Sequence, residues 1–268
     1  MERIPPRSDP MRALSPLPFQ KAGALAACAL VALFTACTSE VPMVHGSGPP
    51  VQERREFRPV ERVTVEGGLE LTVHVVGDGD GPLARFSRGG DSFLWIEAPE
   101  DIVHLVEHVV SGDHLTLRVR DGLRLDPVPS LELTVRRLVE LEARGTGEVD
   151  LRMGGEAAAG AAPMSEHLRI IARGSVDVRG SGAVGALEIL QEGSGDLRLE
   201  RLRAGALLHR SRGSGDAWAR VDGPVEVELH GSCDLHLSGD AVIERLDARG
   251  DGEVIRPTRE SGGARSPR

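Results

Sequence analysis

The sequence has no tyrosine, and aromatic residues make up only 3% of its 268 residues. It also has one lysine, Lys21, so every later cation is an arginine or a histidine. Acidic residues outnumber basic ones by 41 to 32, which gives a formal net charge of −9. Because a polyanionic backbone is bound by an excess of cations, nucleic acid is not expected as a partner.

Scarce aromatics also restrict what the core is made of. It has to be built from valine, leucine, isoleucine and alanine, while 33 glycines punctuate the chain. This composition favours β-structure with many tight turns over a helical bundle. No segment beyond the leader has the apolar spacing of an amphipathic helix, so an all-β domain is predicted.

A basic segment followed by an apolar run opens the chain. Residues 1–21 carry four basic side chains, and residues 22–36 carry no charge. A run of that length is shorter than the roughly 20 residues of a spanning helix, so the pattern predicts a secretory signal. The letters LFTAC from Leu33 to Cys37 resemble a bacterial lipobox and predict lipidation of Cys37. Cleavage without lipid is the alternative.

The leader fixes the expected organisation of the chain. We predict a lipoprotein signal peptide at 1–36, a flexible tether at 37–55, one domain at 56–257 and a disordered tail at 258–268. The expected partner is a membrane, bound through the N-terminal lipid. Thr38 in place of aspartate predicts delivery to the outer membrane. With Cys28 removed and Cys37 lipidated, Cys233 stands alone, so no disulfide framework is expected.

One short phrase recurs, namely a glycine, a small polar residue, usually a second glycine, and an acid. Apolar and polar residues alternate with period two on both sides of it, which indicates strands. The repeat that carries His209 and Ser211 fits least well, and its apolar phase is expected to slip to Leu208 and Ala206. The first glycines stand at positions 145, 174, 193, 213, 231 and 250, so all steps but the first are 18 to 20 residues.

Short strands with a corner every 19 to 20 residues cannot bury an apolar face alone, but stacked coils can. The repeat therefore predicts a β-solenoid with Gly-Ser-Gly-Asp corners. Its long first step contains an Ala/Gly-rich insert at 154–165. Val176 and Cys233 replace the second glycine, which predicts weaker corners there. Residues 56–137 lack the phrase and are predicted to be less regular β-structure that caps the solenoid.

Three segments carry a family resemblance: Val63 to Val73 (VTVEGGLELTV), Asp113 to Leu117 (DHLTL) and Leu138 to Val149 (LVELEARGTGEV). Together with the serial corners, they resemble the bacterial auto-transporter-adhesin head GIN domain family over residues 56–257. The resemblance implies a right-handed β-helix-like fold, export and frequent lipoprotein anchoring. It supplies no catalytic residues.

Two histidine motifs have the letters of metal sites. His104 and His108 fit the H-x-x-E-H pattern of zinc peptidases, but on the expected strand they lie about 13 Å apart. His230, Cys233 and His236 flank one corner and offer soft-metal donors. We expect a fortuitous cluster there, and neither motif predicts an enzyme.

The acid that ends each phrase is the main candidate site. If the coils stack in register, these carboxylates form a ladder spaced by about 4.8 Å, in which neighbours repel by about 1 kcal/mol. Calcium could compensate, as in Gly/Asp-rich β-rolls, but we expect backbone capping and neighbouring arginines to do so. The acids are Glu148, Asp177, Asp196, Asp216, Asp234 and Glu253. The arginines are Arg144, Arg173, Arg212 and Arg249.

The sequence therefore predicts a non-enzymatic exported lipoprotein, an adhesin or a cell-envelope scaffold, whose partner is a surface protein or a glycan. No cofactor is expected. The alternatives are a calcium-stabilised β-roll-like module and a carbohydrate-binding or carbohydrate-cleaving β-helix. Candidate contact residues are the corner acids, an exposed Trp218 and the 154–165 insert.

Overall fold

The computed structural model describes residues 41–77, 92–120, 123–154 and 163–256, which belong to one compact unit, Val41–Arg268. The predicted signal peptide, Cys37, the 258–268 tail and most of the 154–165 insert lie outside the described residues. The described part is all-β, as predicted, with one short 3-10 turn, η2 (Val103–Leu105). None of its helices has the length and apolar character needed to cross a membrane.

Two sheets contain all the described strands. The small one pairs β1 (Met43–His45) with β8 (Arg124–Asp126), and the large one has 15 strands. The N-terminal strands of the large sheet are β2 (Pro50–Phe57), β3 (Arg62–Glu66), β4 (Leu69–Val75), β5 (Ser92–Pro99), β6 (Val106–Ser111), β7 (His114–Val119) and β9 (Ser130–Val135). The later ones are β10 (Glu140–Met153), β11 (Ser165–Gly193), β12 (Leu197–Gly213), β13 (Ala217–Val221), β14 (Pro224–Gly231), β15 (Leu235–Ser238), β16 (Val242–Gly250) and β17 (Val254–Ile255).

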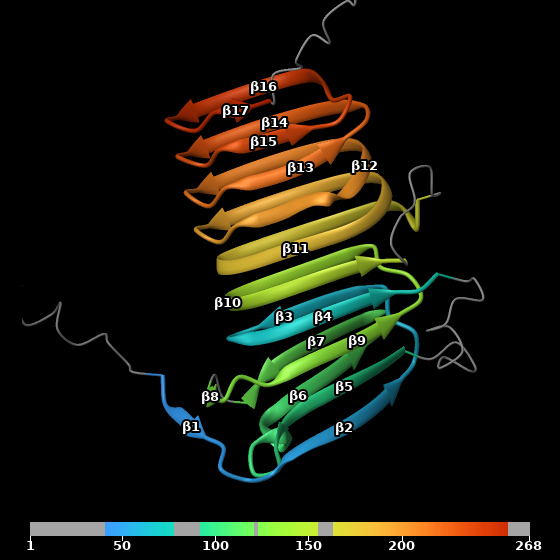
Figure 1. Cartoon of the computed structure of the whole chain (residues 1–268), viewed down its shortest axis with the longest axis vertical. Helices are drawn as coiled ribbons and strands as arrows, with labels where there is room; N and C mark the ends of the chain where they lie inside the picture. Colours follow the sequence, from blue (N-terminus) through green and yellow to red (C-terminus); the bar gives the residue numbers. More distant parts are fainter. Residues whose placement is uncertain (1–40, 78–91, 121–122, 155–162, 257–268) are drawn as a thin grey trace, which may run out of the picture. The chain divides into compact units, whose positions relative to one another are not determined.

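The repeats from β10 onward lie parallel and in register. Gly145 of β10 is opposite Gly174 of β11, and Gly193 is opposite Gly213 of β12. The same register continues from β12 to β14 and from β14 to β16. Successive repeats consequently stack on one another, as Figure 1 shows from the yellow to the red strands. We call this arrangement the stack.

An apolar row runs through the interior of the stack. Residues with period-two spacing point alternately inward and outward, so each strand contributes one buried row. Leu141, Ile170 and Ile189 illustrate the row, each with no exposed surface. Because every repeat is covered by the next one, these rows form a continuous core without aromatic side chains.

The predicted phase slip in the fourth repeat is wrong. His209 and Ser211 keep the inward phase and are buried, whereas Leu208 and Ala206 are half-buried on the outer face. The physical reason is the register of β12, whose backbone is paired on both sides. A one-residue slip would break both ladders at once.

The stack begins before the first recurring phrase. β3 and β4 pair in parallel with the two halves of β10, so residues 62–75 form one more repeat. Gly67 takes the corner position, because its N–H donates to the carbonyl of Arg144 at 2.9 Å. β7 and β9 in turn pair with β3 and β4. The less regular N-terminal region therefore extends the stack.

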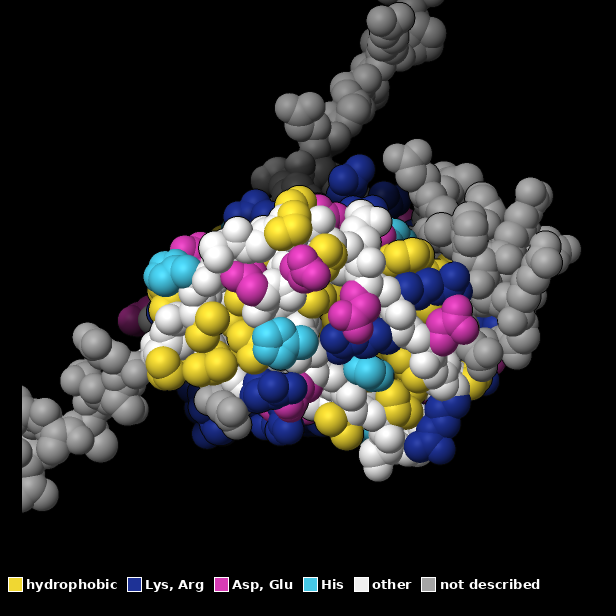
Figure 2. Space-filling model, turned by 90° about the horizontal axis from the view of Figure 1, so that it is seen from below, with side chains coloured by type: hydrophobic (Ala, Val, Ile, Leu, Met, Phe, Trp, Pro, Cys, Tyr) yellow, Lys and Arg dark blue, Asp and Glu magenta, His cyan; other side chains and the backbone are white. Residues whose placement is uncertain are grey.

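Antiparallel strands close the N-terminal end of the stack. β5 pairs with β9 and with β2, and β6 pairs with β7, all antiparallel. Arg55 of β2 ties this end together, since its Nη1 donates to the carbonyl of Val106 at 2.6 Å. Figure 2 shows this end, where charged and histidine side chains lie among apolar ones.

The C-terminal end has no such cover. β16 pairs with β14 alone, and β17 pairs with β15 alone. Leu246 covers Val227 of the preceding repeat but is itself 51% exposed, because no described strand lies on top of it.

The predicted tether at 37–55 differs from the structure. Met43–His45 and Pro50–Phe57 are strands β1 and β2. Composition misled the prediction, because Arg54 of β2 packs its guanidinium over the rings of Phe93 and Trp95 at 4.9 and 5.7 Å. Such contacts from a distant strand order a segment that is rich in proline and glycine.

The corner glycines of the stack predict a stability effect. Gly213 has a φ of +148°, and a Cβ there would collide with the carbonyl oxygen of Gly193. We expect Gly213→Ala to lower the free energy of unfolding by about 3 kcal/mol, through strain and displaced backbone. Gly112→Ala is the matched control, with a φ of +65° and no atom within 4 Å of the added carbon. It should cost only about 1 kcal/mol; equal losses in urea unfolding would contradict the stacked corner.

Candidate functional site: the corner acids and the outer faces

The corner acids form a hydrogen-bonded ladder. Each inner aspartate accepts a hydrogen bond, through its Oδ1, from the backbone N–H of the acid in the next repeat. The bonds are Asp196 N–H to Asp177 at 2.9 Å, Asp216 N–H to Asp196 at 3.1 Å, Asp234 N–H to Asp216 at 3.0 Å and Glu253 N–H to Asp234 at 2.9 Å. The structure therefore brings five of the six predicted residues into one continuous chain of contacts.

The two glutamates of the set stand at its ends. Glu148 pairs with Arg179 instead of accepting from the next corner, and Glu253 only donates its N–H. An aspartate has one methylene fewer than a glutamate, so its carboxylate reaches the adjacent strand, about 4.8 Å away, without folding back. Aspartate is therefore the residue that the inner corners require.

The predicted neutralisation by corner arginines is wrong for the arginines that form ion pairs. Arg144 pairs with Glu66 and Glu142. Arg173 pairs with Glu142 and Glu192, and Arg249 with Asp247. The residue just before the first corner glycine points to the outer face of its strand, away from the acid three residues later. Backbone N–H groups rather than these arginines partner the inner acids.

These arginines belong instead to ion pairs along the outer face of the strands that precede the corners. One run takes one residue from each of six successive repeats, and opposite charges alternate along it. Its members are Glu140, Arg169, Glu188, Arg210, Glu228 and Arg245, with N–O distances from 3.2 to 3.7 Å. Single exposed pairs contribute little, but a shared network fixes the long side chains. We call this run the ion-pair ladder.

The corners with Val176 and Cys233 are as well formed as the others. Both side chains point inward and are 3% and 1% exposed. The next repeat supplies a glycine above each of them, because a Cβ on Gly195 or Gly252 would collide with the carbonyl oxygen of Val176 or Cys233. A side chain is tolerated where it fills the interior, so the predicted weakening of these corners is not seen.

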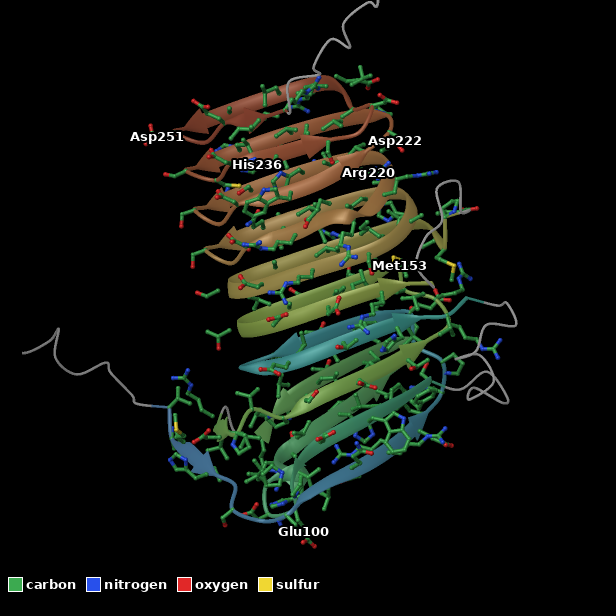
Figure 3. The ribbon with its side chains drawn as sticks, viewed as in Figure 1. Glu100, Met153, Arg220, Asp222, His236 and Asp251 are labelled. Carbon is green, nitrogen blue, oxygen red and sulfur yellow. The ribbon has the colours of Figure 1, made fainter. Side chains whose placement is uncertain are left out.

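A second column of glycines was not predicted. A Cβ on Gly205 would lie 2.7 Å from the carbonyl oxygen of Gly185, and one on Gly223 would collide with that of Gly205. Asp222 and Asp251, labelled in Figure 3, mark the opposite edges of the stack that carry the two columns. The signal was in the sequence, since positions 185, 205 and 223 repeat the steps of 20 and 18 seen at 193, 213 and 231.

The zinc-peptidase letters do not lie on a helix. His104 is exposed in the 3-10 turn η2, and His108 lies on β6. Burial, with the charge of Arg55, lowers the pKa of His108, whose Nδ1 is 3.4 Å from the Arg55 guanidinium. The geometry of a helical zinc motif is therefore missing.

The cluster around Cys233 is not brought together. Cys233 points into the core, where burial raises the pKa of its thiol, while His236 points outward. His236 stacks on Trp218 with ring centroids 4.9 Å apart, and the guanidinium of Arg198 lies over the other ring at 5.1 Å. Among the described residues, no group of three metal-donor side chains is close enough to hold an ion. The prediction of an exposed Trp218 is also wrong, because its ring is half-buried between these neighbours.

A buried polar cluster lies behind the corners. Gln191 donates to the carbonyls of Gly195 and Gly215 at 2.8 and 2.9 Å and so ties two corners to one strand. His209 lies 3.4 Å from the Gln191 side-chain oxygen, and its Nδ1 has no hydrogen-bond partner among the described residues. Complete burial lowers the pKa of His209 to about 4.

The Asp216 link predicts how the ladder is stabilised. Asp216→Ala removes the acceptor for the Asp234 N–H and should lower the free energy of unfolding by about 1 to 2 kcal/mol. Asp216→Asn keeps a side-chain oxygen and should cost less than half of that. Asp251→Ala, in an exposed residue without a side-chain bond, is the control. Equal losses for alanine and asparagine, together with a chelator-sensitive melting temperature, would instead indicate bound calcium.

Burial of His209 predicts a pH dependence of stability. In the unfolded chain the imidazole takes up a proton near pH 6.5, whereas in the folded chain its pKa is about 4. The unfolded state binds more protons between these values, so stability falls as the pH falls, by about 3 kcal/mol in total. His209→Leu should remove this part of the acid sensitivity. A control, His104→Leu, changes an exposed side chain and should keep it; identical pH profiles for all three proteins would contradict the burial.

The geometry defines the class of protein before any comparison is made: an all-β protein of stacked parallel repeats. The family model described as "Putative auto-transporter adhesin, head GIN domain" matches residues 84–241. The match covers more than half of the chain, so the chain belongs to this family. The resemblance found in the sequence is confirmed.

Solved structures share the fold. A protein described as a putative adhesin from Bacteroides fragilis is 17% identical, has a TM-score of 0.54, and is covered completely by 80% of this chain. A protein from Parabacteroides distasonis described as a putative lipid binding protein is 15% identical, with a TM-score of 0.49, 81% of this chain and all of that one covered. No protein with curated function matches the sequence. At these identities, the first likeness shows the fold alone.

Proposed function

We propose that the protein is a non-enzymatic exported lipoprotein that displays a right-handed β-solenoid as an adhesin or scaffold of the cell envelope. The observation that carries this proposal is the in-register stack, whose corner acids are bound by backbone and whose ion-pair ladder is bound internally. The charged side chains therefore support an extended rigid wall. Membership in an adhesin family supports the same function.

The carbohydrate-cleaving alternative gains no support from the described residues. A sugar platform needs an aromatic ring with a free face. Trp218 lies between Arg198 and His236, and Trp95 has Arg54 over its ring. The calcium alternative has no specific support either, since each inner aspartate already has a backbone partner.

Lipid attachment tests the export half of the proposal. Cells grown with an alkyne-bearing fatty acid should label the protein, and Cys37→Ser should abolish both the label and the membrane fraction. Cys28→Ser is the matched control and should keep both. Labelling that follows Cys28, or no labelling at all, would contradict the predicted anchor.

Surface exposure and attachment test the other half. If the protein is an adhesin, protease added to intact cells removes it, and deletion of its gene lowers attachment to a host or biofilm surface. A scaffold remains protected in intact cells, and its deletion increases envelope leakage. An enzyme-like turnover of envelope glycans by the purified protein would overturn both versions.

A further inference from the structure

The two outer faces of the stack handle charge differently. Along the ion-pair ladder, acids and arginines alternate from repeat to repeat. On the face after the corners, Arg179 of β11 is directly opposite Arg198 of β12. Like charges in opposite positions of neighbouring strands are destabilising unless an anion lies between or beside them. This face therefore has an electrostatic cost that the first face avoids.

A groove of about 870 Å³ lies on this second face. Its floor is shallow because three small residues follow Arg179 on β11. Gly182 has a φ of +113°, and a Cβ there would collide with the carbonyl oxygen of Met153, the residue labelled in Figure 3. Ser181 is the outward side chain of this floor, and Arg152 of β10 and Arg201 of β12 occupy the positions on either side of it.

We name this hollow the arginine groove, after its lining side chains Arg152, Arg179, Ser181, Arg198, Glu200 and Arg201. Four guanidinium groups face it, in a chain whose formal net charge is −9. Arg152 pairs with Asp150 at 2.6 Å, and Arg198 is 3.6 Å from Asp196. Arg201 has no ion pair within the described part of the chain. A guanidinium has five donors, so a single carboxylate leaves several of them available to a ligand.

We infer that the arginine groove binds the sulfate or carboxylate groups of an acidic saccharide, an inference that rests on the proposed adhesin function. Planar guanidinium groups bind such oxyanions through two parallel hydrogen bonds. The volume is in the usual range for small-ligand sites, about 300 to 1,000 Å³. The groove is open to solvent, and its arginines come from three neighbouring strands, so a chain of sugars can lie across the repeats. With both faces of Trp218 covered, recognition depends on charge rather than on stacking.

Calorimetric titration of the purified full chain tests this site. The probes are a heparin-derived tetrasaccharide, trigalacturonate and the uncharged maltotetraose. We expect binding of at least one acidic probe, weakened by added salt, and none of maltotetraose. Arg201→Gln and Arg152→Gln should each weaken binding about tenfold. Arg212→Gln makes the same charge change at an exposed residue outside the groove and should leave binding unchanged.

Three results would overturn the site. These are equal weakening by Arg212→Gln, binding of maltotetraose as strong as that of the acidic probes, and binding to anionic phosphatidylglycerol vesicles without saccharide binding. The attachment assay separates this inference from the proposed function. If Arg201→Gln leaves attachment normal while gene deletion abolishes it, only the groove is wrong. If deletion changes neither attachment nor envelope integrity, the proposed function fails first.

Discussion

The close contact between corner backbones is the constraint on which the rest of the structure depends. Above Gly193 there is no room for a Cβ on Gly213, and the same holds from Gly213 to Gly231. Corners that touch through their backbones fix the spacing and register of the strands on both sides. That register places each apolar row over the previous one and lets a core without large aromatics become continuous. Glycine at the corner is therefore a requirement of the stack itself.

The register also determines where the charges go. A parallel stack brings identical positions of every repeat into columns, so any charged position becomes a column of like charges unless the sequence alternates. The corner acids escape this through backbone N–H donors, and the ion-pair ladder escapes it by alternation. The arginine groove follows neither solution. That exception, on a scaffold that otherwise satisfies its charges, makes the groove the most informative surface of the protein.

Much of the fold was predictable because the physics repeats along the chain. The glycine spacing and the period-two pattern gave the strands, the corners and the all-β class. The extra repeat at 62–75 was missed because Gly67 and Gly145 are adjacent in space but separated by the whole β5–β9 segment. The inward phase of His209 was missed as well, since backbone pairing on both sides overrides the preference of one side chain for water.

The candidate site was predictable only in part. Sequence spacing identified the corner acids, but it could not show that the inner aspartates bond to the next backbone, because that depends on side-chain reach across strands. The arginine groove was missed entirely. Its residues lie in three different repeats, and a register shift between Arg179 and Ser181 brings Arg201 opposite Ser181. Such a shift leaves no mark in the spacing of the phrases.

Amide hydrogen exchange at the corners is the measurement that tests the central claim most directly. The N–H groups of Asp196, Asp216 and Asp234 donate to the carboxylates of the preceding repeat. In a calcium-free buffer, we predict that they exchange as slowly as the amides of the flanking strands, because the corners open only with the stack. Fast exchange at these three positions beside protected strands would contradict the account, since the corners would then not hold the repeats in register.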